Sequence, residues 1–214
     1  MTRLTTIGCY HAHYSNCQLI DHVLSHDQIE LRHFVDPGLA MIANDLPEHM
    51  IREKVEQQLE WIRASKVDHI LVTCTFFSSF INQTDMDTPI MTMDDVLYHV
   101  VRSSEIPIIL VFTNPETVAP TMNKLSFQLN KDQHGATPKQ HVIPNTFDLL
   151  LHGHVTDYHE IVFQELSRLA SIHRGKQIVA AQLSMTEAAN RAKAQFPNIQ
   201  NLTDELGRMM IPSL

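Results

Sequence analysis

The pattern of apolar and polar positions divides the chain into alternating strands and helices. Ile51, Val55, Leu59 and Ile62 recur every three or four positions and predict an amphipathic helix over residues 48–65. Short apolar runs, typical of buried strands, lie at residues 5–10, 29–35, 67–73 and 106–113 and again from residue 178. Strands that alternate with helices predict an α/β fold with parallel sheets, in which ligands bind at the carboxyl ends of the strands.

The same pattern occurs twice along the chain. Residues 70–78 and 178–186 are both apolar runs that end in a turn bearing hydroxyl groups, and each run follows an amphipathic stretch. Each run also precedes an X-Pro step, and the separation of Pro89 from Pro197 equals that of the two runs. We therefore predict two pseudo-symmetric lobes, each a parallel sheet flanked by helices, with a cleft between them that holds a ligand.

Three segments between these runs have weaker signals. Residues 39–47 have little pattern and are expected to form a loop after Asp36 ends the second strand. The polar stretch 131–144 is expected to be a surface excursion. Asn114 or Thr117 is suited to cap the helix that follows the strand at 106–113.

Composition limits the class of protein. The chain has 214 residues, of which 43% are hydrophobic and 19% charged, as in ordinary soluble globular proteins. Its formal net charge of −8 argues against nucleic-acid binding, which needs clustered Lys and Arg. It has no apolar run long enough to span a membrane or to act as a signal peptide. With three cysteines, which cannot all pair within one chain, we expect a cytoplasmic protein.

The 14 histidines raise the question of a metal site. Cys9, His11 and His13 would share one face of a strand, with Cys17 nearby, so a zinc site is conceivable there. Further histidines gather at residues 22–33 and 152–159. None of these groups has the paired spacing of a structural zinc site or a His-Glu-x-x-His helix, and we expect neither a metal nor a cofactor.

Cys74 is the main candidate for chemistry. A cysteine at the end of a strand, just before a helix, faces free backbone N–H groups and the positive end of the helix dipole, both of which lower the pKa of the thiol. Such a thiolate can remove an acidic proton or attack an activated double bond. The alternative is that Cys74 only fills space, because free cysteines are common in protein cores.

The order of motifs resembles the aspartate/glutamate/hydantoin racemase superfamily over nearly the whole chain. The matching segments are the two strand-turn runs, Val35–Leu39, Phe112–Thr121 and Ala181–Met185. The resemblance implies two α/β lobes with a small carboxylate or amino-acid-like substrate between them, and a cysteine from each lobe flanking its α-carbon. We expect residues 1–98 with about 199–214 to form the first lobe and residues 99–198 the second.

The resemblance also implies roles for individual residues. Cys74 matches the catalytic cysteine of the first lobe, and Thr75 lies in the turn that holds the substrate carboxylate. The loops that open the two lobes supply further expected substrate-binding residues: Cys9, His11, Asp36, Thr113 and Asn114. The second cysteine should fall at Gln182 or Leu183, neither of which can act as a base. Ser184 is expected either to bind the ligand or to cap a helix.

One catalytic cysteine disfavours a symmetric racemase, because inversion needs a proton donor on each face of the substrate. We expect a cofactor-independent racemase-like isomerase, with decarboxylation of a malonate-like acid or isomerisation of an unsaturated diacid as alternatives. Recruitment of Cys9, His11, Cys17 or His159 as the opposite acid is a weaker alternative. A non-catalytic binding protein on the same fold also remains open, and a homodimer is possible.

Overall fold

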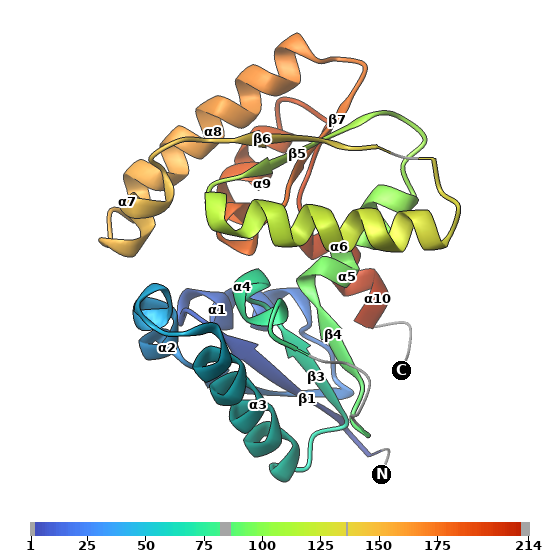
Figure 1. Cartoon of the computed structure of the whole chain (residues 1–214). Coiled ribbons are helices and arrows are strands. Elements are labelled where there is room, and N and C mark those ends of the chain that lie inside the picture. The colour runs from blue at the N-terminus through green and yellow to red at the C-terminus, as the bar shows by residue number, and fades with distance from the viewer. Residues whose placement is uncertain (1–2, 82–86, 136, 211–214) are drawn as a thin grey trace. The chain divides into compact units, whose positions relative to one another are not determined.

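The computed structural model describes residues 3–81, 87–135 and 137–210. The chain divides into two compact units, of which unit 1 comprises Met1–Asp95 and Leu206–Leu214 and unit 2 comprises Val96–Glu205. Within the described residues, each unit has one four-stranded sheet whose paired strands are all parallel. Figure 1 shows helices flanking each sheet. The predicted α/β fold is thus confirmed.

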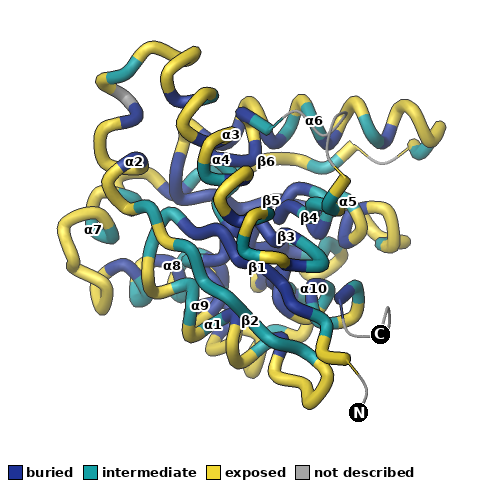
Figure 2. The backbone as a smooth tube through the Cα atoms, turned by 90° about the horizontal axis from the view of Figure 1, so that it is seen from below, coloured by how far each residue is buried: buried dark blue, intermediate teal, exposed yellow. Residues whose placement is uncertain are grey.

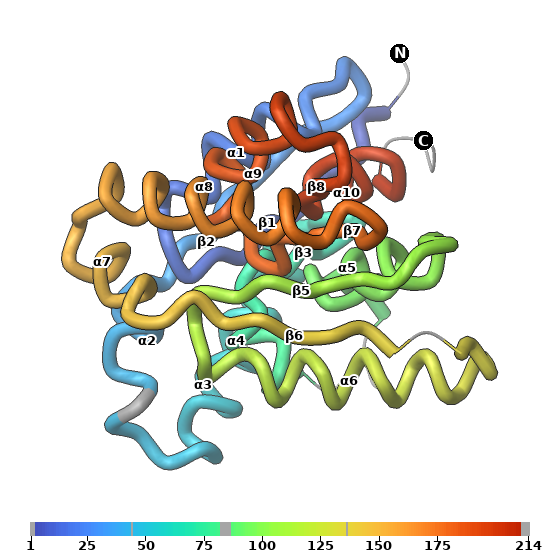
Figure 3. The backbone as a smooth tube through the Cα atoms, turned by 90° about the horizontal axis from the view of Figure 1, so that it is seen from above, coloured from blue at the N-terminus to red at the C-terminus, as the bar shows by residue number. Residues whose placement is uncertain are grey.

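Unit 1 is built around the sheet β2-β1-β3-β4. The strands are β1 (Thr5–His11), β2 (Ile29–Val35), β3 (His69–Val72) and β4 (Ile90–Thr92). The helical segments are α1 (Ser15–Val23), α2 (Pro37–Ile42), η1 (Ala43–Asp45), α3 (Glu48–Ala64) and α4 (Thr75–Ser78). Helix α5 (Met93–Arg102) begins in unit 1 and α10 (Thr203–Met210) ends in it. Figures 2 and 3 agree that α1 and α3 lie on opposite faces of this sheet.

The apolar stripe of α3 forms the core on one face of the unit 1 sheet. Its four members, predicted from the sequence, are at most 4% exposed and pack with Tyr10 and Val72 of the sheet. Gly8 on β1 lies directly under this helix, where a Cβ atom would come 2.5 Å from Ile62 Cγ2. The close approach of α3 to β1 therefore depends on the missing side chain at Gly8.

Unit 2 repeats the topology with the sheet order β6-β5-β7-β8. The strands are β5 (Ile108–Phe112), β6 (Lys139–Val142), β7 (Gln177–Ala180) and β8 (Ile199–Gln200). The helical segments are η3 (Pro115–Thr117), α6 (Val118–Lys131), α7 (Phe147–Leu151), α8 (Val155–Ile172), η4 (Leu183–Met185) and α9 (Thr186–Lys193). Helices α8 and α9 pack on the sheet in one core, and Figures 2 and 3 show α6 on the opposite face.

Two segments differ from the sequence expectation. The expected loop over 39–47 is wrong, because Asp36 accepts a hydrogen bond from the Leu39 N–H at 3.0 Å and caps α2. The polar stretch 131–144 contains β6, an edge strand paired with β5 on one side only. No helix among the described residues is long and apolar enough to cross a membrane.

The Gly8 contact gives a test of the core. Gly8→Ala is expected to lower the free energy of unfolding by about 1–3 kcal/mol, because its methyl group must displace Ile62 in a packed core. Chemical denaturation followed by circular dichroism measures the change. Gly207→Ala on α10 is the matched control, because its nearest neighbour would be the Val23 carbonyl oxygen at 3.7 Å. Equal stabilities of the two variants would contradict the close approach of α3.

Candidate functional site

Cys74 lies just beyond the carboxyl end of β3, as the residue that precedes α4. Its backbone is extended, with φ −96° and ψ 115°, and the chain turns into helix at Thr75. Cys74 and Thr75 are both half-buried, and Cys74 packs against the edge of the core under α3. The structure therefore puts this cysteine at a strand end, as the sequence predicts.

The surroundings of the Cys74 thiol raise its pKa to about 11. Burial is the largest cause, because it penalises the charged thiolate, and the carboxylate of Asp94 acts in the same direction. The backbone N–H groups of Phe77 and Phe76 favour the thiolate but do not outweigh burial. Helix α4 has only four residues and contributes little dipole. The expectation that the strand end and the helix dipole lower the pKa of Cys74 is therefore wrong.

A buried phenol lies near Cys74. Tyr10 on β1 stacks on Phe77, with 4.9 Å between the ring centroids. Burial raises the pKa of Tyr10, and the nearby Asp36 and Cys74 raise it further. Its hydroxyl oxygen is buried and has no hydrogen-bond partner among the described residues. A buried hydroxyl without a protein partner is costly, and a bound ligand is one way to satisfy it.

A buried carboxylate contacts the α4 segment that follows Cys74. Asp94, at the start of α5, is 6% exposed and accepts a hydrogen bond from Ser78 Oγ at 2.5 Å. It acts on the Cys74 thiol electrostatically. Neither Asp94 nor Tyr10 is part of a sequence motif, so no pattern along the chain singles them out. The only available signal was their position: Tyr10 lies one residue before the end of β1 at His11, and Asp94 lies two residues after the end of β4 at Thr92.

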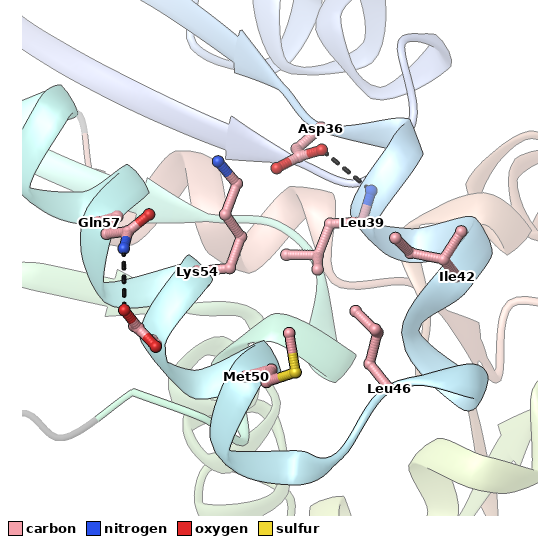
Figure 4. A pocket seen from close by; sticks show the side chains of 8 residues that line it. Asp36, Leu39, Ile42, Leu46, Met50, Lys54 and Gln57 are labelled. Atoms are coloured by element: carbon pink, nitrogen blue, oxygen red, sulfur yellow. Dashed lines mark hydrogen bonds between the residues drawn. The ribbon is translucent and has the colours of Figure 1, made fainter.

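Asp36 has a structural task at the end of β2. One carboxylate oxygen caps α2, and the other accepts a hydrogen bond from Gln58 at 3.3 Å. Asp36 also lines an open pocket of about 350 Å³ between α2 and α3, where Leu39, Leu46 and Met50 gather (Figure 4). The residues that line this pocket do not include Cys74. The pocket is mainly apolar and differs from the expected carboxylate site.

Cys9 and His11 lie on β1, both completely buried. Strand alternation turns them to the face opposite Tyr10, and therefore away from the α3 core that contains Cys74. The ring of His11 bonds Thr73 through Nδ1 and His33 through Nε2, each at 2.8 Å. The structure thus brings both residues together with His33, which the sequence did not link to them.

Gln182 occupies in unit 2 the position that Cys74 occupies in unit 1. It follows β7 by two residues and precedes η4, with an extended backbone at φ −131° and ψ 141°. Its side-chain oxygen accepts hydrogen bonds from Thr113 N at 2.7 Å, Thr113 Oγ1 at 2.9 Å and Asn114 N at 3.1 Å. Its amide nitrogen donates to Thr117 Oγ1 at 3.1 Å. Gln182 therefore holds the loop after β5 in place.

The remaining predicted residues of unit 2 join the same network. Asn114 caps η3 by accepting from Glu116 N at 3.0 Å, as predicted. Ser184 lies within η4 and does not cap a helix, so the capping alternative is wrong. Its hydroxyl bonds the buried Tyr158 hydroxyl at 2.8 Å, and Tyr158 in turn bonds Thr113 Oγ1 at 3.1 Å. Burial raises the pKa of Tyr158, so it is a neutral donor here.

His159 and Cys17, weaker candidates for a second acid, are placed elsewhere. His159 Nδ1 lies 3.0 Å from Glu187 of α9, and its ring is half-buried. Cys17 is half-buried and belongs to α1, the helix on the face of the sheet opposite α3. The structure therefore gathers Thr113, Asn114, Gln182 and Ser184 in unit 2 and leaves Cys74 in unit 1 with Tyr10 and Asp94.

The role of Gln182 can be tested by removing its amide. Gln182→Met is expected to lower stability by about 1–3 kcal/mol for each backbone N–H left without an acceptor, at Thr113 and Asn114. Thermal or chemical unfolding gives the change. Gln164→Met, at an exposed glutamine of α8, serves as the control and should change stability far less. A Gln182→Met variant as stable as the native protein would contradict the conclusion that Gln182 holds the loop after β5 in place.

Comparisons with known proteins show which other proteins have a similar fold. No protein-family model matches the chain, and no curated protein matches it in sequence. Solved structures do match over nearly the whole chain. Glutamate racemase from Francisella tularensis in complex with D-glutamate is similar at a TM-score of 0.68 and 12% identity, covering 100% of this chain and 81% of that one.

Two other enzymes give the same result. Aspartate racemase from Picrophilus torridus is similar at a TM-score of 0.70 and 13% identity, covering 98% of this chain and 94% of that one. Maleate isomerase from Pseudomonas putida S16 with maleate is similar at a TM-score of 0.55 and 11% identity, covering 99% and 92%. The fold expected from the sequence is thereby confirmed: this chain shares the two-unit α/β fold of these racemases and of the isomerase.

Proposed function

We propose that the protein is a cofactor-independent isomerase of the aspartate/glutamate/hydantoin racemase superfamily, acting on a small carboxylate with Cys74 as base or nucleophile. The observation that carries the proposal is the surroundings of this thiol. It lies at a strand's carboxyl end, receives backbone N–H groups from Phe76 and Phe77, and has the unpartnered Tyr10 hydroxyl nearby. The proteins of similar fold named above are racemases and a maleate isomerase, which supports the same class of reaction.

The chemistry follows from the protonation state and charge of each group. The Cys74 thiolate is the reactive form, since a neutral thiol is a poor base and nucleophile. Its backbone N–H donors partly offset the cost of desolvating the charge. Tyr10, whose pKa is raised, stays neutral and donates a hydrogen bond to a substrate oxygen. Asp94 opposes negative charge in the same place, so the thiolate forms only as a minor species.

The position of unit 2 that is equivalent to Cys74 offers no second acid or base. Gln182 has no titratable proton, and its amide is already engaged with Thr113, Asn114 and Thr117. Inversion at a carbon centre needs a proton donor on the second face. We therefore favour reactions that need a single thiolate. In one, the thiolate adds to the double bond of an unsaturated diacid, the new single bond rotates, and elimination restores both the thiolate and the double bond.

Proton removal next to a carboxylate and decarboxylation of a malonate-like acid are the other one-sided reactions. The rival function is a non-catalytic carboxylate-binding protein, which the raised pKa of Cys74 favours. A binding protein needs the hydrogen-bond donors of the site but not the thiolate. The two functions differ in whether bonds of the ligand are made and broken, and this difference can be measured directly.

Proton NMR in deuterium oxide with amino acids, hydantoins, malonates and maleate tests the proposal. Exchange of an α-proton, or a new product, is expected with the native protein and should fall by about a hundredfold or more in Cys74→Ser, because general bases contribute roughly 10²–10⁴ to rates. Cys17→Ser is the matched control, a half-buried cysteine of the same unit, and should keep full activity. Ligand-dependent chemical shifts without any exchange would support the binding protein.

The pKa of Cys74 predicts how reactivity changes with pH. Because this pKa is raised to about 11, the thiolate is scarce at neutral pH, and its fraction grows about tenfold per pH unit until the pKa is approached. Alkylation of Cys74 by iodoacetamide, followed by mass spectrometry of the peptide, should rise with this slope between neutral and alkaline pH. A rate that levels off near pH 7 would show an ionised thiol and overturn the assigned direction of the shift.

A further inference from the structure

We propose that unit 1 contains a binding site for a zinc-type transition-metal ion, formed by Cys9 Sγ, His11 Nε2 and His33 Nδ1. Among the described residues, one ligand atom from each of these side chains lies within 4.8 Å of the others. The site is on the face of the sheet opposite the core that contains Cys74. It is independent of the isomerase proposal, since it uses none of the groups assigned to that reaction.

The register of the sheet creates the cluster. Cys9 and His11 are two residues apart on β1 and therefore point to the same face. In the parallel pairing of β1 with β2, Cys9 is the direct partner of His33. His13, which the spacing of the sequence had offered as the third ligand, lies beyond the end of β1 and bonds Ser15 instead.

The outer nitrogens of both imidazoles are held as in known metal sites. His11 Nδ1 lies 2.8 Å from Thr73 Oγ1, and this hydroxyl donates its own proton to the Tyr10 carbonyl oxygen at 3.2 Å. His33 Nε2 lies 3.0 Å from a carboxylate oxygen of Asp21. Histidines that bind metals usually donate the other ring N–H to a carboxylate or another oxygen acceptor in this way.

Because of these outer hydrogen bonds, neither of the inner nitrogens, His11 Nε2 and His33 Nδ1, carries a proton when the rings are neutral. With an N–H directed to Thr73 and another to Asp21, neutral His11 and His33 each present a lone pair to the other, and the two atoms are 2.8 Å apart. Two lone pairs at this distance need a cation between them, either a proton or a metal ion. Cys9 Sγ beside them supplies a third donor, and its contact with the Ile7 carbonyl oxygen is long, at 3.9 Å.

The donor set selects the metal. Two imidazoles and a thiolate suit zinc and its neighbours, whereas magnesium and calcium prefer oxygen ligands. With zinc–nitrogen bonds of about 2.0–2.1 Å, the two nitrogens would separate to about 3.3 Å in a tetrahedral site. His33 can provide this movement, because its side chain is 20% exposed and Asp21 beside it is 59% exposed. Solvent on that side supplies the fourth ligand, and the Cys9 proton leaves to water on binding.

Cobalt absorption tests the proposal on the full chain after chelation and dialysis. Cobalt(II) added to the native protein should produce tetrahedral ligand-field bands and a thiolate-to-cobalt charge-transfer band, both lost on addition of zinc(II). Cys9→Ser should remove the charge-transfer band, whereas Cys17→Ser and Cys74→Ser should keep it. Zinc(II) should raise the melting temperature of the native protein but not that of Cys9→Ser.

Two further variants keep the test decisive where Cys9→Ser does not fold. His33→Gln should weaken cobalt binding severely, and Asp21→Asn should weaken it by about 10–100-fold, as expected for a residue that orients a ligand. Both side chains are partly exposed, so the fold should survive. A native protein without a charge-transfer band, or a band that persists in Cys9→Ser or is unchanged in His33→Gln, would overturn the proposal.

Discussion

The parallel pairing of β1 with both of its neighbours is the constraint on which the chemistry of unit 1 depends. This strand lies between β2 and β3, and its side chains alternate between the two covered faces of the sheet. Tyr10 turns to one face and stacks on Phe77 beside Cys74. Cys9 and His11 turn to the other face and meet His33. One short strand therefore serves two separate chemical groupings, and a shift of register by one residue would exchange them.

The two units show how one backbone geometry holds different chemistry. Cys74 and Gln182 each lie two residues after a parallel strand and just before a short helical turn. Both residues have an extended backbone. In unit 1 this position holds a thiol that burial keeps neutral, with two N–H groups directed at it. In unit 2 it holds an amide whose oxygen accepts from two backbone N–H groups and a hydroxyl. The repeated topology thus conserves the place of a polar group and not its reactivity.

Elements with strong periodicity could be predicted from the sequence, and those set by neighbouring strands could not. The stripe of α3 and the runs of β1, β2 and β7 are visible because a buried face must be apolar. Strand β6 was missed, because an edge strand of polar residues has no apolar pattern. The position of Cys74 at a strand end could be predicted from the apolar run that precedes it. Its pKa could not, because it depends on burial and on Asp94, which no local pattern reveals. The proximity of Cys9 to His33 can be predicted only when the register between β1 and β2 is known. The spacing within one strand instead suggested His13.

The three hydrogen bonds to Gln182 have a consequence for any anion that approaches unit 2. The N–H groups of Thr113 and Asn114, with the Thr113 hydroxyl, form the kind of donor set that would hold a carboxylate. Gln182 already fills it as a tethered competitor, present at a fixed local concentration that dilution cannot lower. A ligand can use these donors only while the amide is rotated away, so its apparent affinity is reduced by the fraction of time that the set is free. The Gln182 amide thereby sets a threshold: an anion can occupy these donors only by binding this loop more strongly than the amide does.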